Sequence, residues 1–264
     1  MRIALLTDGI TPYVMGGMQR HSFFVAKYLS KNNFKVTLIH YNSSNQNINA
    51  LECFEESERK NIESIVLEFK DNGKLPGHYI RASYNYSVDI FETIKDRIKD
   101  FDFIYAKGFC GWKLLEMKKK GLECPPIAVK FHGMNMFQQQ ANFKSYLESL
   151  MFKKPVLFNM ENADYVFSYG GGITDIILKC GIPKDKVIEV PTGITQDWFD
   201  ETVNVNSIRK FIYIGRYERL KGIEEIQIAI QKLNKNGEEF EFHFIGPIPD
   251  HLKLKAKNVI YHGK

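Results

Sequence analysis

Short runs of apolar residues alternate along the chain with longer segments of helical periodicity. Residues 2–7 (RIALLT) form the first run, and residues 16–33 after it carry apolar side chains at helical spacing. A run that is apolar throughout, rather than at every second position, is typical of a parallel strand covered on both faces. The pattern predicts a buried strand followed by an α-helix.

The same alternation continues to residue 193, with helical segments between most of the runs. This βαβα series predicts an α/β fold whose N-terminal part is a complete, Rossmann-like, doubly wound parallel sheet. The further predicted strands are residues 35–41, 62–69, 101–108, 127–133, 163–170 and 186–193.

Residues 200–207 (DETVNVNS) are polar and show no periodicity, so they are interpreted as a linker between two domains. The alternation then restarts with a strand at 209–215, a helix at 223–237 and strands at 239–246 and 258–264. The expected domains are 1–199, a complete Rossmann-like unit, and 208–264, a partial second Rossmann-like unit.

Composition and charge narrow the classes of partner. The chain of 264 residues is 44% hydrophobic, with a formal net charge of +5 and a pI near 8.8. This mild basicity fits small anions or an acidic membrane surface, and without a basic block interleaved with aromatics it argues against nucleic acid. Four cysteines without metal spacing, and a start (MRIALLTDGI) unlike a signal peptide, predict a cytoplasmic protein with no metal.

Glycines follow the first predicted strand at a helix start. Gly16 and Gly17 offer backbone N–H groups without a Cβ, which suits a phosphate or a sugar hydroxyl, although a tight turn explains the pair equally well. The G-x-G-x-x-G fingerprint of dinucleotide-binding folds is missing here, which argues against a dehydrogenase or a dehydrogenase-like epimerase.

His132 ends the predicted strand at 127–133, and the carboxyl ends of strands line the ligand crevice in open α/β sheets. A structural histidine is the alternative, and for the glycine run 170–172 a flexible helix entry is favoured. Arg216 and Lys221 stand five residues apart at a strand-to-helix turn, a placement that matches a diphosphate if the two are not simply solvated charges.

Several segments, in order, resemble the retaining nucleotide-sugar glycosyltransferases of family four, which have the two-domain GT-B fold. They are GGMQRHSFFVAKYLSKNNFKVTLI, KFHG, DYVFSYGGGITDIILKCGIPKDKVIEVPTGITQDWF and YIGRYERLKGIEEIQIAI. The last contains the pattern G-R-x-x-x-x-K-G, from Gly215 to Gly222. The resemblance spans nearly the whole chain, but residues 42–100 match only in outline.

The resemblance implies that 1–199 is the acceptor-side domain and 208–264 part of the donor domain, and it implies a role for each matching residue. Arg216 and Lys221 would hold the donor diphosphate and stabilise it as the leaving group, within a loop bounded by Gly215 and Gly222. Gly16 and Gly17 would contact the donor phosphate and acceptor, and His132 a hydroxyl of the transferred sugar. The family needs no metal or other cofactor, because two cations offset the charge on the departing diphosphate.

Two departures from the family pattern stand out. The glycine run 170–172 replaces a more usual serine, and the acidic donor motif expected after the third strand of the second domain does not occur before Lys264. The expectation is therefore a C-terminally truncated transferase for polysaccharide biosynthesis that is inactive as this chain. The alternative is a non-catalytic protein of the same fold that binds a glycan or a partner.

Two surface features predict contacts beyond the donor. Phe143, Tyr146, Leu147 and Leu150 stand at helical spacing beside lysines, which suits peripheral contact with an anionic membrane near a lipid-linked acceptor. Packing of this helix on its own domain is the favoured alternative. The strand at Phe211–Ile214 should have an open, apolar edge, so self-association is expected there.

Overall fold

The computed structural model describes residues 1–42, 51–70, 73, 75, 77–140, 142–196, 199 and 209–263. The chain divides into two compact units, Met1–Gly193 and Ile194–Lys264, and each is described by itself. The linker proposed at 200–207 lies outside the described residues.

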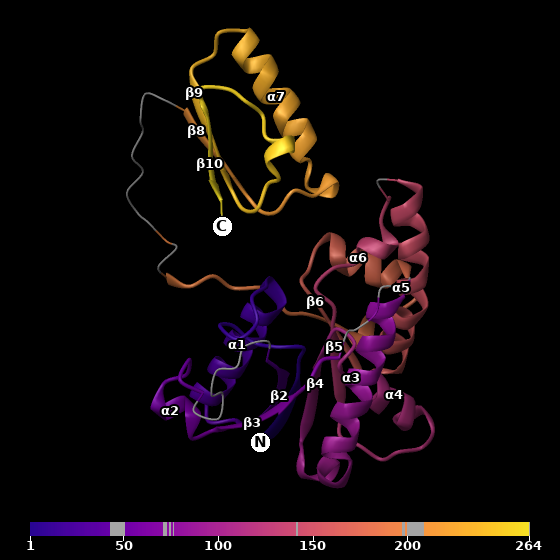
Figure 1. Ribbon diagram of the computed structural model, residues 1–264. Helices are drawn as coiled ribbons and strands as arrows, with labels where there is room; N and C mark the ends of the chain where they lie inside the picture. The colour runs from indigo at the N-terminus through magenta and orange to yellow at the C-terminus, as the bar shows by residue number, and fades with distance from the viewer. Residues whose placement is uncertain are drawn as a thin grey trace. The chain divides into compact units, whose positions relative to one another are not determined.

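The first unit is built on a parallel sheet with the strand order β3-β2-β1-β4-β5-β6-β7 (Figure 1). The doubly wound α/β prediction is confirmed, and each predicted strand is present. The strands are β1 Arg2–Leu6, β2 Lys35–Tyr41, β3 Ile62–Leu67, β4 Phe103–Lys107, β5 Ile127–Lys130, β6 Tyr165–Ser168 and β7 Val187–Glu189.

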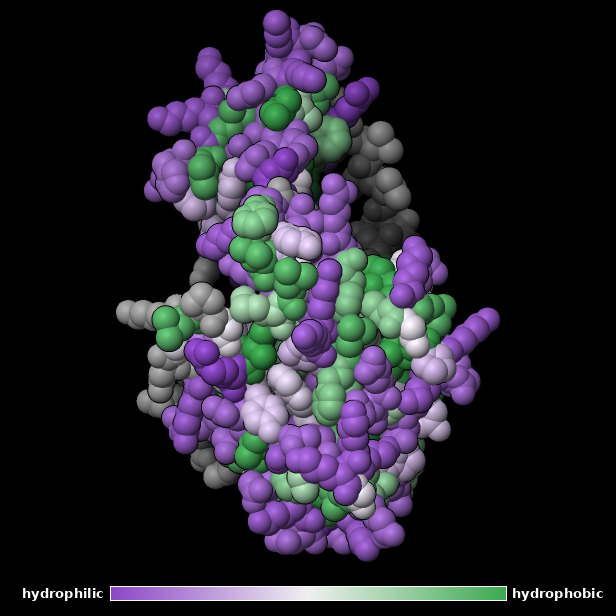
Figure 2. Space-filling model, turned by 90° about the vertical axis from the view of Figure 1, so that its right-hand side faces the viewer, coloured by the Kyte–Doolittle hydropathy of each residue, from purple (hydrophilic) through white to green (hydrophobic). Residues whose placement is uncertain are grey.

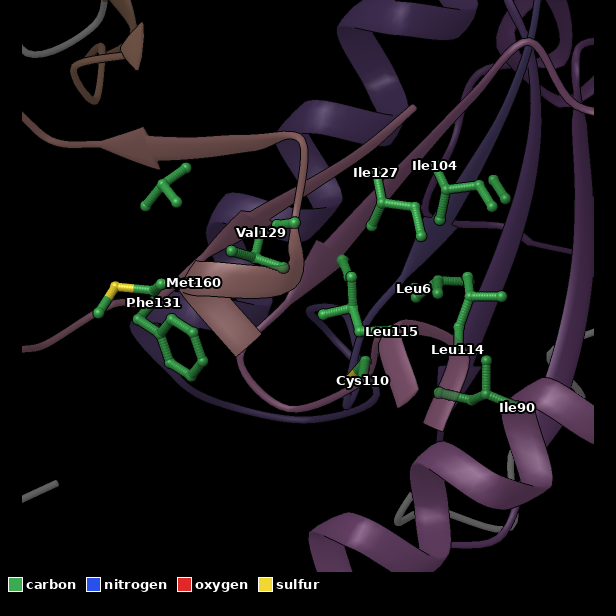
Figure 3. Packing of buried hydrophobic residues seen from close by; sticks show 14 of the residues in the cluster. Leu6, Ile90, Ile104, Cys110, Leu114, Leu115, Ile127, Val129, Phe131 and Met160 are labelled. Atoms are coloured by element: carbon green, nitrogen blue, oxygen red, sulfur yellow. The ribbon is translucent and has the colours of Figure 1, made fainter. Parts of the chain in front are cut away.

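Helices cover both faces of this sheet because its strands are apolar on both sides. On β1, Leu5 packs into a core with Ala26 of α1, whereas Leu6 points to the opposite core. Figure 3 shows this second core, where Ile90 and Leu114 meet the strand residues. The helices are α1 Gly17–Lys31, α2 Glu56–Arg59, α3 His78–Ile94, α4 Trp112–Lys119, α5 Phe143–Asn162 and α6 Gly172–Lys179.

The topology fixes where a ligand site can form. The strand order reverses between β1 and β4, and in open parallel sheets the crevice beyond the carboxyl ends at such a switch point is the usual ligand site. The loops that follow β1, β4, β5 and β6 all leave the sheet at this end, since the strands run parallel.

The second unit has three parallel strands, β8 Arg209–Ile214, β9 Phe240–Ile245 and β10 Val259–Gly263, in the order β10-β9-β8. Helix α7 Ile223–Lys235 covers one face of them (Figure 1). This order is the 3-2-1 half of a Rossmann sheet. A small core forms between this helix and sheet, and it contains Tyr213, Ile223, Ile230, Phe240, Phe244 and Ile248.

The other face of the small sheet carries exposed isoleucines beside a polar group formed by Lys210, Glu241, His243 and His262. Ile212 and Ile214 alternate along β8 with the buried Tyr213 and are 60% and 67% exposed, and Ile260 on β10 is 38% exposed. Within the described residues, β8 pairs only with β9, so its outer edge is also open.

The prediction that the helix at Phe143–Asn162 packs on its own domain is wrong for the first half of the helix. Phe143, Tyr146, Leu147 and Leu150 are 74%, 46%, 48% and 41% exposed. The buried residues of α5 include Val156 and Met160, in its second half, because only that half reaches the core of the sheet. Figure 2 looks onto the side of the first unit where α3, α4 and α5 lie, and shows apolar side chains gathered among charged ones.

In the described part of the chain, no helix is long and apolar enough to cross a bilayer.

Candidate functional site

Two lysines end neighbouring strands of the first sheet and are fully buried. Lys107 is the last residue of β4 and Lys130 the last of β5, and each has no exposed surface. The Nζ of Lys107 lies 2.8 Å from Nδ1 of His21 in α1. The Nζ of Lys130 donates to the Val190 carbonyl at 2.6 Å and lies 3.8 Å from the ring centre of Tyr169.

Burial controls the charge of both amines. It lowers the pKa of Lys107 to about 7, with a further lowering by Lys130, and the pKa of Lys130 to about 8. An ammonium loses its hydration when it is buried, which favours the neutral amine. Both groups therefore titrate near neutral pH, whereas ordinary lysines stay charged there.

His132 follows β5 by two residues and is half-buried beside these lysines. The Tyr169 hydroxyl lies 2.6 Å from its Nδ1 and 2.9 Å from its Nε2, and the His21 ring meets it edge-on at 5.3 Å. Burial and the charge of Lys107 lower the pKa of His132 to about 3. His132 is thus uncharged at neutral pH and acts as a hydrogen-bonding group.

Asp8 lies two residues beyond the end of β1. Its Oδ1 accepts a hydrogen bond of 3.1 Å from Nε2 of Gln19, near the start of α1. Burial raises the pKa of Asp8 to about 6, although Lys107 acts in the opposite direction. A carboxyl group with this pKa can accept or release a proton near neutral pH.

Asp8, Lys107 and His132 line one cavity of about 200 Å³ in the first unit. Most of its remaining wall is apolar. Its aromatic residues are Phe69, Tyr79, Tyr86, Phe109, Phe131 and Phe152.

Gly16 and Gly17 lie at the start of α1, as predicted. Gly16 is the N-cap, and Gly17 is the first helical residue. A Cβ built on Gly17 would meet no atom within 4 Å, so packing does not require glycine there. The absent side chain leaves the helix N-terminus open to a ligand.

Substituting Lys107 with methionine is expected to stabilise the protein at pH 7. The folded pKa of about 7 lies below the ordinary 10.5, so between these values the unfolded chain binds more protons and stability rises with pH. The destabilisation by Lys107 is complete below about pH 7. Lys107→Met should therefore raise the melting temperature by roughly 3–8 °C at pH 7, and the gain should shrink toward pH 10.

Thermal unfolding of both proteins, followed by circular dichroism in steps from pH 6.5 to 10, checks this expectation. A difference in melting temperature that stays constant with pH would contradict it.

In the second unit, the two predicted cations meet a single carboxylate. Arg216 Nε pairs with Glu218 Oε1, and Lys221 Nζ lies 3.7 Å from Glu218 Oε2. The side chains of Arg216 and Lys221 are 72% and 46% exposed. Both cations therefore reach one anionic group while they remain open to solvent.

Glycines bound this loop on both sides. Gly215 directly follows β8, and Gly222 is the N-cap of α7 with a φ of 69°, in the left-handed region that favours glycine. A Cβ on Gly215 would lie 3.3 Å from Lys221 Nζ. Arg219 in the same loop pairs with Glu224 and Glu225, whereas the two predicted cations both contact Glu218.

His132 was predicted from the sequence as a site residue, but the groups around it were not. A lysine ends each of two neighbouring apolar strands, FIYAK and IAVK, and this repeated cation at a strand's carboxyl end was a usable signal. Asp8 was a similar signal, because it is a charged residue just after the end of the apolar strand β1. No pattern in the sequence indicated His21 or Tyr169, because their role depends on where α1 and β6 lie. Within the described ranges, no group of three or more metal-binding side chains occurs.

No protein-family profile and no curated protein matches this chain. Solved structures do match it. Sucrose-phosphate synthase from Thermosynechococcus elongatus aligns with all of the chain and 70% of its own length, at 14% identity and a TM-score of 0.71. The Anabaena protein HepE, in complex with UDP and glucose, aligns with all of the chain and 69% of its own length, at 12% identity and a TM-score of 0.58.

The similarity also includes an enzyme of another reaction class. UDP-GlcNAc 2-epimerase from Neisseria meningitidis, bound to UDP-GlcNAc, aligns with all of the chain and 72% of its own length, at 14% identity and a TM-score of 0.54. The missing glycine fingerprint therefore argues only against a dinucleotide-dependent epimerase. At these identities the comparisons establish the fold, and the chain has two Rossmann-like units of the GT-B type.

Proposed function

We propose that the protein is a nucleotide-sugar-dependent glycosyltransferase whose second unit binds the donor diphosphate through Arg216 and Lys221. The observation that carries this proposal is the shared carboxylate of Glu218, which both cations contact. A diphosphate carries more negative charge than one carboxylate and offers oxygens to both groups. A diphosphate bound there would take the place of Glu218 as the partner of both cations.

The fold supports the same reading. Two solved structures of the same fold, HepE and the Neisseria epimerase, hold UDP with glucose and UDP-GlcNAc respectively. Since fold alone does not fix function, transfer and epimerisation are separated by experiment.

In the proposed reaction, the bond between the anomeric carbon and the diphosphate oxygen breaks and a bond to the acceptor oxygen forms, with retention at the anomeric carbon. The proton of the acceptor hydroxyl passes to the Asp8 carboxylate. Arg216 and Lys221 stabilise the charge on the departing diphosphate. These two cations take the role that a metal ion would otherwise have. Uncharged His132 contacts a hydroxyl of the transferred sugar.

A donor screen tests this proposal. The chain is incubated with UDP-glucose, UDP-galactose, UDP-GlcNAc, ADP-glucose and GDP-mannose, and released nucleotide and sugar configuration are measured by NMR. Release of nucleotide that the Arg216→Ala/Lys221→Ala variant fails to produce supports transfer. A changed sugar configuration on an intact donor would identify an epimerase. Donors that stay unchanged and unbound would contradict the proposal.

Gly17→Ala is expected to leave stability unchanged and to weaken the binding of UDP about tenfold. A Cβ at Gly17 meets no atom within 4 Å, but it projects where the helix N-terminus would meet a ligand. Melting temperature and UDP affinity are measured side by side. Gly193→Ala, also in open space, is the matched control. Equal affinities for both variants would remove Gly17 from the proposed site.

The proposed acceptor is a glycan or a lipid-linked molecule, and the exposed half of α5 is proposed to contact the membrane. Leu147→Glu should lower the fraction of protein that pellets with vesicles rich in phosphatidylglycerol at low salt by about half or more. Ile188→Glu, at another exposed apolar residue, is the control. A wild-type chain that does not pellet with these vesicles would contradict this contact.

A further inference from the structure

The cavity of the first unit is unusual for a site that would hold a polyhydroxylated sugar. A sugar ring needs hydrogen-bond partners on many sides, because an unpaired buried hydroxyl is costly. Here six aromatic side chains, together with Met18, Met136 and Val156, make up most of the wall. The polar side chains are few, namely Asp8, Ser83, Lys107 and His132, besides the hydroxyls of the tyrosines.

Part of this polarity is already used within the protein. The Tyr86 hydroxyl donates to the Thr7 carbonyl at 3.0 Å, and His132 is bonded to Tyr169. Asp8 accepts from Gln19 through Oδ1, and Thr7 and the Asp8 backbone also bond to its carboxylate, so that these contacts take up about three of its roughly four acceptor positions. Its carboxylate therefore keeps acceptor capacity for a ligand in the cavity.

Lys107 supplies the matching donor. A lysine ammonium has three N–H groups, and among the described residues its one hydrogen bond goes to Nδ1 of His21. Lys107 has no exposed surface, yet it lines the cavity. A buried amine with unused donors favours an oxygen placed beside it.

We propose that this cavity binds the apolar part of the acceptor, with the acceptor hydroxyl donating to Asp8 and accepting from Lys107. The substrate class is an alcohol or phenol with an apolar body about the size of one ring, so of the two proposed kinds of acceptor the cavity favours the lipid-linked one over a bare glycan. That the bound molecule is the acceptor rests on the proposed function. The binding of such a molecule can be measured without any donor.

The experiment compares three probes on the intact chain by ligand-observed NMR titration. p-Cresol carries the hydroxyl, 4-methylanisole is its methyl ether, and methyl glucoside is polyhydroxylated. p-Cresol should bind at least tenfold more tightly than methyl glucoside. It should bind about tenfold more tightly than 4-methylanisole, whose ether cannot donate to Asp8.

Variants place this binding in the cavity. Ser83→Phe and Met136→Trp fill the cavity from different sides and should each abolish the p-cresol signal, whereas Val66→Phe, on β3 outside the cavity, should not. Met136 is only partly buried, so its variant remains informative if Ser83→Phe fails to fold. Asp8→Asn should weaken p-cresol about fivefold and leave 4-methylanisole unchanged.

Tighter binding of methyl glucoside, or p-cresol binding that survives both filling variants, would overturn the inference. So would equal affinity for p-cresol and its ether. A chain that releases nucleotide from a donor but binds no p-cresol overturns this inference and leaves the proposed function standing. The opposite pair of results overturns the proposed function and supports the cavity as an alcohol-binding site.

Discussion

Replacing Lys221 with alanine is expected to weaken the binding of inorganic pyrophosphate and of UDP by about tenfold or more. A charge-assisted hydrogen bond contributes about 1.5–3 kcal/mol, which corresponds to roughly 10- to 150-fold in affinity. Pyrophosphate is included because it tests the phosphate contacts without any nucleoside. Isothermal titration calorimetry at low salt measures both ligands, and Arg216→Ala should show a loss of similar size.

Two comparisons make this result specific. Lys232→Ala removes an exposed lysine of the same unit and should change nothing. Glu218→Gln should strengthen pyrophosphate binding several-fold, because the carboxylate that now competes for both cations becomes neutral. Equal affinities for the wild type, Lys221→Ala and Lys232→Ala would remove the diphosphate from this loop.

The chain is expected to self-associate through the exposed face and the open edge of its second sheet. The molecular mass measured in solution should then clearly exceed that of the monomer. Ile212 and Ile214 are exposed on the face opposite α7, and the outer edge of β8 is open within the described residues. Unpaired backbone groups beside apolar side chains favour pairing with another strand. Sedimentation velocity at tens of micromolar should show species larger than the 30.6 kDa monomer.

The double substitution Ile212→Lys/Ile214→Lys should return the protein to the monomer, because two buried charges in the contact are costly. Ile228→Lys changes an isoleucine of α7 that is 53% exposed and should leave association unchanged. A wild-type chain that sediments only as a monomer across this concentration range would show that the exposed face stays free in solution.

The strands were predictable because their signal is local. Parallel strands buried on both faces must be apolar throughout, as in Ala4–Leu6 of β1. Each strand can therefore be recognised from its own residues, without knowledge of its neighbours. The handedness of the connections then limits their order, and the order found for both sheets is the Rossmann one. The exposure of the first half of α5 was not predictable, because helical spacing of apolar residues does not reveal what they face.

The loop from Gly215 to Gly222 was also readable, since both cations and both glycines lie within one turn of the chain. The sharing of Glu218 between Arg216 and Lys221 was not, because it depends on how the loop folds back. The cavity could not be predicted from the sequence at all. Asp8, Lys107 and His132 come from the ends of β1, β4 and β5, which are far apart in the sequence.

By itself, the sequence determined the α/β architecture and the candidates at strand ends, because periodicity and the residues beside a strand or helix end are local properties. The tertiary structure alone decided which of these groups share an environment. Lys107, from β4, acquires its lowered pKa only because burial and Lys130 on the adjacent strand surround it. Burial and proximity between distant segments are set by packing, and no window of the sequence contains them.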